Sequence, residues 1–127
     1  MPHMTIEYSA NVENIVDMQK LCELFREAML ETKLFPRAGI RVRAIKCEAY
    51  AIADGSGGNY FIDILIRIGQ GREVLLRKQA LTSIFEKAKV FLEPQIKAHP
   101  LSISIEMREI DSEFSLKRNG IRDKIGD

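Results

Sequence analysis

Large apolar side chains alternate with other residues from Tyr60 to Ile68, and this pattern constrains the fold more than any other feature of the chain. Successive side chains of a strand point to opposite faces of its sheet, so the run predicts a strand with one buried face. The opposite face carries Asp63 and Arg67, a possible charge pair, among apolar groups, and we expect it to be partly covered. The segment should therefore pack one side against the hydrophobic core.

Two other segments show the three- and four-residue spacing of amphipathic helices. Their apolar faces consist of Met18, Leu21, Cys22, Phe25, Ala28 and Met29 in the first, and of Leu81, Ile84, Phe85, Ala88, Phe91 and Leu92 in the second. The residue before a proline is pushed out of the helical region. We therefore expect the first helix to stop before Pro36 and the second to end at Pro94.

The remaining apolar alternation predicts strands over Met4 to Tyr8, Ile40 to Ala53 and Leu101 to Met107, with Asp54 to Gly58 as a turn. The order is strand–helix–strand, turn, strand–helix–strand. Each half is long enough for a right-handed crossover, which places its two strands parallel. We predict one α+β domain over residues 1–127, a four-stranded mixed sheet with both helices on one face.

Such an architecture leaves the second face of the sheet uncovered in a monomer. The strands contain more apolar residues than a solvated face usually has, so we expect burial against other subunits of a closed homo-oligomer. The segment after Asp111 is mostly polar. Its cations, Lys117, Arg118, Arg122 and Lys124, fit a solvated tail that docks on a neighbour or frays.

Composition excludes several functional classes. The net charge is +1 and the isoelectric point is about 7.8, so no general attraction to nucleic acid or to a membrane is expected. There is no signal-peptide pattern and no apolar stretch long enough to span a bilayer, which favours a cytoplasmic protein. Cys22 and Cys47 are expected to be reduced thiols, and no metal-ligand spacing is present.

Pro2 is the first candidate for chemistry, because it becomes the first residue once Met1 is removed. Its nitrogen would then be a free secondary amine. An α-amine titrates near neutrality, and burial or nearby cations lower its pKa further. A base with a pKa near the working pH is suited to proton transfer. Pro2 is therefore a candidate general base.

Three arginines are the second candidates. Arg41 and Arg43 leave the same face of a strand, and Arg72 follows the Gly69–Gly71 turn at a helix start, where backbone N–H groups favour an anion. Guanidinium groups bind carboxylates in pairs of hydrogen bonds, so the three could hold a di- or tricarboxylate. The side chain of His3 should point away from those of Pro2 and Met4, so a structural or interface role suits it better than a role in the site.

With these residues in view, the chain resembles the 5-carboxymethyl-2-hydroxymuconate Δ-isomerase family of the tautomerase superfamily. The shared segments are Pro2–His3, Phe35–Arg43, Ala53–Gly55, Ile68–Arg72 and Phe114–Asn119. They extend over essentially the whole chain. The FPxAGIRxR pattern followed by GxGR is the most specific of them.

The resemblance implies a tautomerase-like duplicated β-α-β fold, assembled as a homotrimer with active sites near the subunit interfaces. It also implies a cofactor-free isomerisation of a 2-hydroxymuconate in aromatic-acid catabolism. In such families the amino-terminal proline transfers the proton, which corresponds to Pro2. Arginines at the positions of Arg41 and Arg72 hold the carboxylates, with Arg43 a weaker candidate. Two alternatives stay open: a tautomerase for another unsaturated oxo or hydroxy acid, and a non-catalytic ligand-binding oligomer.

Overall fold

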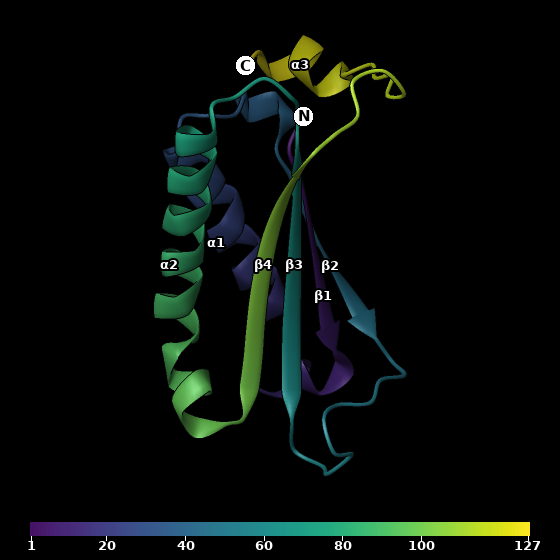
Figure 1. Cartoon of the computed structure of the whole chain (residues 1–127), viewed down its shortest axis with the longest axis vertical. Helices are drawn as coiled ribbons and strands as arrows, with labels where there is room; N and C mark the ends of the chain where they lie inside the picture. The colour runs from purple at the N-terminus through teal and green to yellow at the C-terminus, as the bar shows by residue number, and fades with distance from the viewer.

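The computed structural model describes residues 1–127. A layer of two long helices packs on one four-stranded sheet, and a short C-terminal extension follows (Figure 1). The elements in chain order are β1 (His3–Ser9), the short 3₁₀ helix η1 (Ala10–Asn14), α1 (Met18–Glu31), the 3₁₀ turn η2 (Arg37–Gly39), β2 (Arg41–Cys47), β3 (Tyr60–Ile68), α2 (Val74–Ala98), β4 (Leu101–Glu109) and α3 (Gly120–Ile125). The predicted order of strands and helices is therefore confirmed. Only η1, η2 and α3 are additional.

The sheet has the strand order β2-β1-β3-β4. β1 is parallel to β2, and β3 is parallel to β4, as the two crossovers require. The two halves join through β1 and β3, which run antiparallel. The predicted four-stranded mixed sheet built from two β-α-β units is confirmed.

α1 and α2 lie side by side on one face of this sheet (Figure 1). The alternate residues of β1 and β3 that face the helices are fully buried: Met4, Ile6, Ile62, Ile64, Ile66 and Ile68. From α1 and α2, Leu21, Phe25, Met29, Ile84 and Leu92 fill the same core. Burying one such side chain contributes roughly 1.5–3 kcal/mol. This layer is what holds the N-terminal strand in place.

β2 ends earlier than the sequence predicts, at Cys47 rather than Ala53. The reason lies in its partner. Ser9, the last residue of β1, is paired with Cys47, and the chain then turns into η1. β2 is an edge strand, so beyond Cys47 it has no backbone groups with which to pair. The apolar residues that follow belong to a loop.

α2 continues through Pro94 to Ala98, so the predicted end of this helix was wrong. Proline removes one backbone donor from a helix but does not by itself forbid another turn. Here the turn is retained by Ile96, which packs against the core, and by the His99 N–H, which donates to the Gln95 carbonyl at 2.9 Å. The packing of Ile96 therefore outweighs the tendency of proline to end a helix.

The uncovered face of the sheet is more polar than expected. The residues that point away from the helices include His3, Thr5, Glu7, Arg41, Arg43, Asp63, Arg67, Ser104, Glu106 and Arg108. Only a few apolar groups, such as the partly buried Leu65, lie among them. The apolar excess of the strands is used against α1 and α2. It is therefore no argument for an oligomer.

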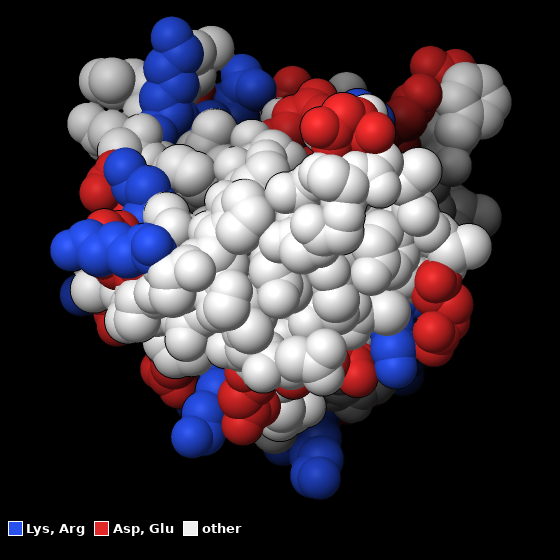
Figure 2. Space-filling model, turned by 90° about the horizontal axis from the view of Figure 1, so that it is seen from below, with Lys and Arg blue, Asp and Glu red and all other residues white.

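Both chain ends lie at one end of the molecule, where α3 crosses above the sheet (Figure 1). The opposite end carries the β2–β3 loop and the α2–β4 turn. Figure 2 views the molecule from that end and shows a broad uncharged surface with Lys, Arg, Asp and Glu at its rim. This end of the molecule therefore shows no cluster of charged side chains at its centre.

Candidate active site

Pro2 lies directly before β1, and it is buried. Its carbonyl oxygen accepts a hydrogen bond from the backbone N–H of Arg41 at 3.1 Å, which extends the β1–β2 pairing by one residue. The prolyl ring is thereby held at the start of the central strand β1, beside the start of β2. Pro2 and Arg41 are therefore neighbours across the β1–β2 pair.

Gly39 packs against the prolyl ring. A Cβ atom at this glycine would lie 3.2 Å from Cδ of Pro2 and 3.4 Å from Cα of Met1. The second of these contacts disappears when Met1 is removed, but the first remains. A side chain here would therefore push the prolyl ring by a few tenths of an ångström, and glycine allows the close approach of η2 to the chain start.

The α-amine in this chain belongs to Met1, one residue before the prolyl nitrogen. Its pKa lies below the ordinary value of 8.0. Partial burial is the main cause, followed by repulsion from Lys117, Arg72, Arg41 and Arg122 in that order. An amine in this environment stays unprotonated to lower pH than an exposed one, because both causes disfavour its charged form.

Arg41 lies beside Pro2 on β2. Its Nη1 donates to the carbonyl oxygen of Gly39 at 2.8 Å, and its Nη2 is 3.5 Å from Oδ1 of Asn119. These contacts orient the guanidinium group near the chain start. They also show that Arg41 is tied to both η2 and the C-terminal tail.

Arg72 is held by its own surroundings. Its Nε donates to the carbonyl oxygen of Leu34 at 3.2 Å, and its Nη1 donates to that of Gly69 at 3.1 Å. The guanidinium also lies over the ring of Phe35, with its central carbon 5.3 Å from the ring centroid. The position of Arg72 is thus determined by contacts within the chain, and its charge is one of the causes that lower the pKa of the Met1 amine.

Arg43 contacts His3 across the β1–β2 pair. Its Nη1 lies 3.3 Å from Nδ1 of His3. The pKa of His3 is lowered by partial burial and then by Arg43, Arg67 and Arg41, so the neutral imidazole is favoured. As expected, His3 points to the opposite side from Met4. Arg41 and Arg43 share its face of the sheet.

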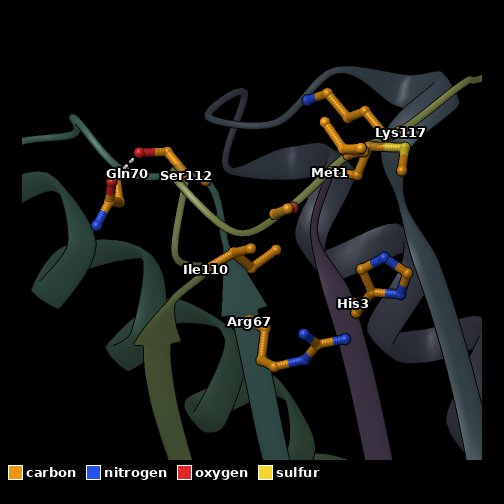
Figure 3. A pocket seen from close by; sticks show the side chains of 10 residues that line it. Met1, His3, Arg67, Gln70, Ile110, Ser112 and Lys117 are labelled. Atoms are coloured by element: carbon orange, nitrogen blue, oxygen red, sulfur yellow. Dashed lines mark hydrogen bonds between the residues drawn. The ribbon is translucent and has the colours of Figure 1, made fainter.

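A pocket of about 340 Å³ opens beside Met1 on the uncovered face (Figure 3). Its lining consists of Met1, His3, Arg67, Gly69, Gln70, Ile110, Ser112, Ser115, Leu116 and Lys117. In Figure 3, His3 and Arg67 lie on one side of the pocket, on β1 and β3, and Met1 and Lys117 lie on the other. None of the three arginines predicted to bind substrate lines this pocket.

Sequence analysis missed three residues of this region. Arg67 was expected as a possible ion-pair partner of Asp63, but residues four apart on a strand are separated by about 13 Å. Asp63 instead accepts a hydrogen bond from Ser104 at 2.5 Å. Lys117 was assigned to a solvated tail, and Asn119 was given no role of its own. The one available signal was the Phe114–Asn119 segment of the family resemblance.

The tail reaches the site because Asn119 anchors it. The side-chain amide of Asn119 donates to the Ala38 carbonyl at 3.1 Å. Its oxygen accepts from the backbone N–H groups of Ile121 and Arg122, at 3.0 and 3.2 Å, and so caps α3. Lys117 is thereby carried to the chain start by a segment distant in sequence.

The structure offers no group of three or more His, Cys, Asp or Glu side chains that could hold a metal ion. None of its helices has both the length and the apolar character needed to cross a membrane.

The fold is shared with other proteins of known structure. Solved structures that share only the fold include a macrophage migration inhibitory factor-like protein from Entamoeba histolytica, with a TM-score of 0.65 at 13% identity, and a fused 4-OT, with a TM-score of 0.65 at 16% identity. These two likenesses show the shared fold, and the matches given next show that the protein is an isomerase of the tautomerase superfamily.

The narrower family follows from closer relatives. The family model for 5-carboxymethyl-2-hydroxymuconate isomerase matches residues 2–125, so the chain belongs to this family. A 5-carboxymethyl-2-hydroxymuconate Delta-isomerase from Escherichia coli is 29% identical over 121 residues, which cover 95% of this chain and 96% of that protein.

Two solved structures agree with this assignment. A 5-carboxymethyl-2-hydroxymuconate delta-isomerase superposes with a TM-score of 0.91 at 28% identity, covering 97% of this chain and 91% of the other. A 5-carboxymethyl-2-hydroxymuconate isomerase from Deinococcus radiodurans R1 gives 0.89 at 27% identity, covering 97% and 92%.

Proposed function

We propose that the protein converts 5-carboxymethyl-2-hydroxymuconate to its conjugated 2-oxo isomer without a cofactor. The observation that carries this proposal is the chain start, where Pro2 is buried and four cations lower the pKa of the adjacent Met1 amine. The family and the solved relatives supply the substrate class. An amine kept neutral by burial and positive charge is suited to accept a proton from an acidic hydroxyl.

The proton moves between two atoms of the substrate. The nitrogen of Pro2, freed by removal of Met1, takes the proton from the 2-hydroxyl group. The electrons of the broken O–H bond form the 2-oxo group, and the dienolate double bonds shift along the chain. The prolinium then returns the proton to carbon 5, which completes the isomerisation with no net gain or loss of atoms.

The arginines bind the substrate and stabilise the intermediate. In this proposal Arg41 and Arg72 hold carboxylates and offset the negative charge that spreads through the dienolate. A hydrogen bond to a charged group contributes about 1.5–3 kcal/mol. Arg43, which contacts His3, is the lesser candidate for this role.

The assembly and location are also part of the proposal. A fused 4-OT of the same fold forms a symmetric trimer, and we propose a homotrimer for this chain. Exposed apolar residues near the site, including Val74, Leu75, Phe114 and Leu116, are available for contacts between subunits. We also propose a cytoplasmic location, which agrees with the removal of Met1 that the mechanism needs.

The test is to compare three proteins in an ultraviolet assay that follows loss of the dienol. The first is the mature protein, with the absence of Met1 verified by intact mass. The second has a lysine inserted before Pro2, which blocks the prolyl nitrogen. The third is Pro2→Ala, also lacking Met1. We expect the inserted residue to abolish activity and Pro2→Ala to lower kcat by about 10²–10⁴-fold, the usual contribution of a general base.

Equal activity of the three proteins would remove Pro2 from the mechanism. Full activity of the mature protein on other unsaturated oxo acids, with none on 5-carboxymethyl-2-hydroxymuconate, would assign it to a different tautomerase reaction. Loss of ligand binding together with activity would point to misfolding, so the melting temperature of each variant is measured alongside.

A further inference from the structure

Two cations of the pocket beside Met1 have no partner within the chain. Arg67 on β3 and Lys117 on the tail both line it, and neither forms a salt bridge or a side-chain hydrogen bond. Arg118 and Arg122, in contrast, are paired with Asp123 and Asp127. The pocket lining contains no aspartate or glutamate. The lining therefore carries positive charge that nothing in the chain neutralises.

These two cations differ from the arginines of the proposed mechanism. Arg41 already donates to the carbonyl oxygen of Gly39, and Arg72 donates to those of Leu34 and Gly69. Arg67 and Lys117 are exposed, and they belong to different elements that face the same space. Two unneutralised cations on facing walls of a pocket form a site for an anion.

The proposed substrate has one carboxylate more than an ordinary muconate, because of its carboxymethyl arm. We propose that Arg67 and Lys117 bind the carboxylate of this arm and so select three-carboxylate over two-carboxylate substrates. The inference rests on the proposed function for the identity of the arm. The binding preference for a third carboxylate can be measured separately from catalysis.

The position of the pocket supports this assignment. It adjoins Met1 and lies on the uncovered face, so a substrate held at Pro2 can extend its arm into it (Figure 3). Ser112 and Ser115 add hydroxyl groups to the wall. Ser112 donates to Oε1 of Gln70 at 2.6 Å, which joins the tail to the turn before α2. The cavity thus has the charge and the polar lining that a carboxylate requires.

The test uses two saturated acids that cannot react. One is 2-(carboxymethyl)hexanedioate, which has the carbon skeleton and the three carboxylates of the substrate. The other is hexanedioate, which lacks the arm. Dissociation constants are measured by titration calorimetry for the mature wild type, Arg67→Met, Lys117→Met, the double variant and Lys117→Arg. Arg108→Met and Lys124→Met serve as controls, since the first pairs with Glu106 and the second lies in α3 outside the pocket.

We expect the wild type to bind the three-carboxylate acid about 10-fold or more tightly than hexanedioate, the factor for one charged hydrogen bond. Each methionine variant should lose most of this preference and the double variant all of it, with little change for hexanedioate. Lys117→Arg and both controls should retain it. A wild type without preference, or variants that weaken both acids equally, would overturn the assignment. A preference that persists in an enzyme without isomerase activity would support the third-carboxylate subsite and refute the proposed reaction.

Discussion

Gly39 shows how closely the chain start is packed at the scale of one residue. The ring of Pro2 lies against this glycine, and a Cβ atom there would come within 3.2 Å of the Pro2 Cδ atom. Contacts this short require a displacement of a few tenths of an ångström. Because the reacting groups must be held in near-attack geometry, a small shift of the prolyl nitrogen has a large effect on rate.

We predict that Gly39→Ala lowers kcat/KM by about 10-fold or more while changing the melting temperature little. Gly57→Ala is the matched control, since a Cβ at Gly57 meets nothing within 4 Å. The measurements are steady-state kinetics and thermal unfolding of both variants. Activity of Gly39→Ala equal to that of Gly57→Ala would mean that the position of the prolyl ring is not critical.

The C-terminal tail matters at the scale of an element. α3 is a short helix with no buried residue, so its own packing contributes little. It is stabilised mainly from outside, by Asn119 and by Arg37, whose Nη2 donates to the Ile125 carbonyl at 2.7 Å. The tail that carries Lys117 to the site therefore depends on a few polar contacts.

Asn119→Ala should consequently release α3 without unfolding the domain. Loss of a helix cap costs about 0.5–2 kcal/mol, which is enough to open a marginal helix. We expect faster amide hydrogen exchange in α3 and faster tryptic cleavage after Lys117 and Arg118, with β1 and β3 unchanged. Asn14→Ala, which removes an exposed asparagine without side-chain hydrogen bonds, is the control. Unaltered exchange in α3 would show that Asn119 does not hold the tail.

The elements that could be predicted from the sequence are those whose signal is local. The alternation in Tyr60–Ile68 and the helical spacing around Phe25 specify strands and a helix directly, because each pattern reflects burial of one face. The wrong predictions concern the ends of β2 and α2, which are determined by contacts with other elements. β2 stops at Cys47 because β1 stops at Ser9, and α2 continues past Pro94 because Ile96 is packed.

The site residues likewise divide into those with a signal in the local sequence and those that only the tertiary fold reveals. Pro2, Arg41 and Arg72 were selected because their residue types suggested the chemistry, and the structure brings all three to the chain start. Arg67 and Lys117 could not be placed by local pattern. Arg67 is one of several charged residues on the open face, and Lys117 is one of several cations in the tail. Only the tertiary fold shows that these two share a pocket.

At the scale of the whole molecule, the environment of the chain start is assembled from distant segments. Arg41 comes from β2, Arg72 from the turn before α2, Lys117 from the tail and Arg122 from α3, and all four lower the pKa of the α-amine, after burial. Neither half of the duplicated fold supplies them alone. The proton-transfer chemistry that we propose is thus a property of the complete chain.

The most direct test is a titration of the Pro2 nitrogen by NMR in ¹⁵N-proline-labelled mature protein, with the absence of Met1 confirmed by intact mass. Burial and the surrounding cations disfavour the protonated amine, so we predict a pKa below the usual α-amine range of about 7.7–8.0. The neutral, basic form would then dominate at neutral pH. A pKa well above 8, with the amine protonated throughout the working range, would contradict the assignment of Pro2 as the base.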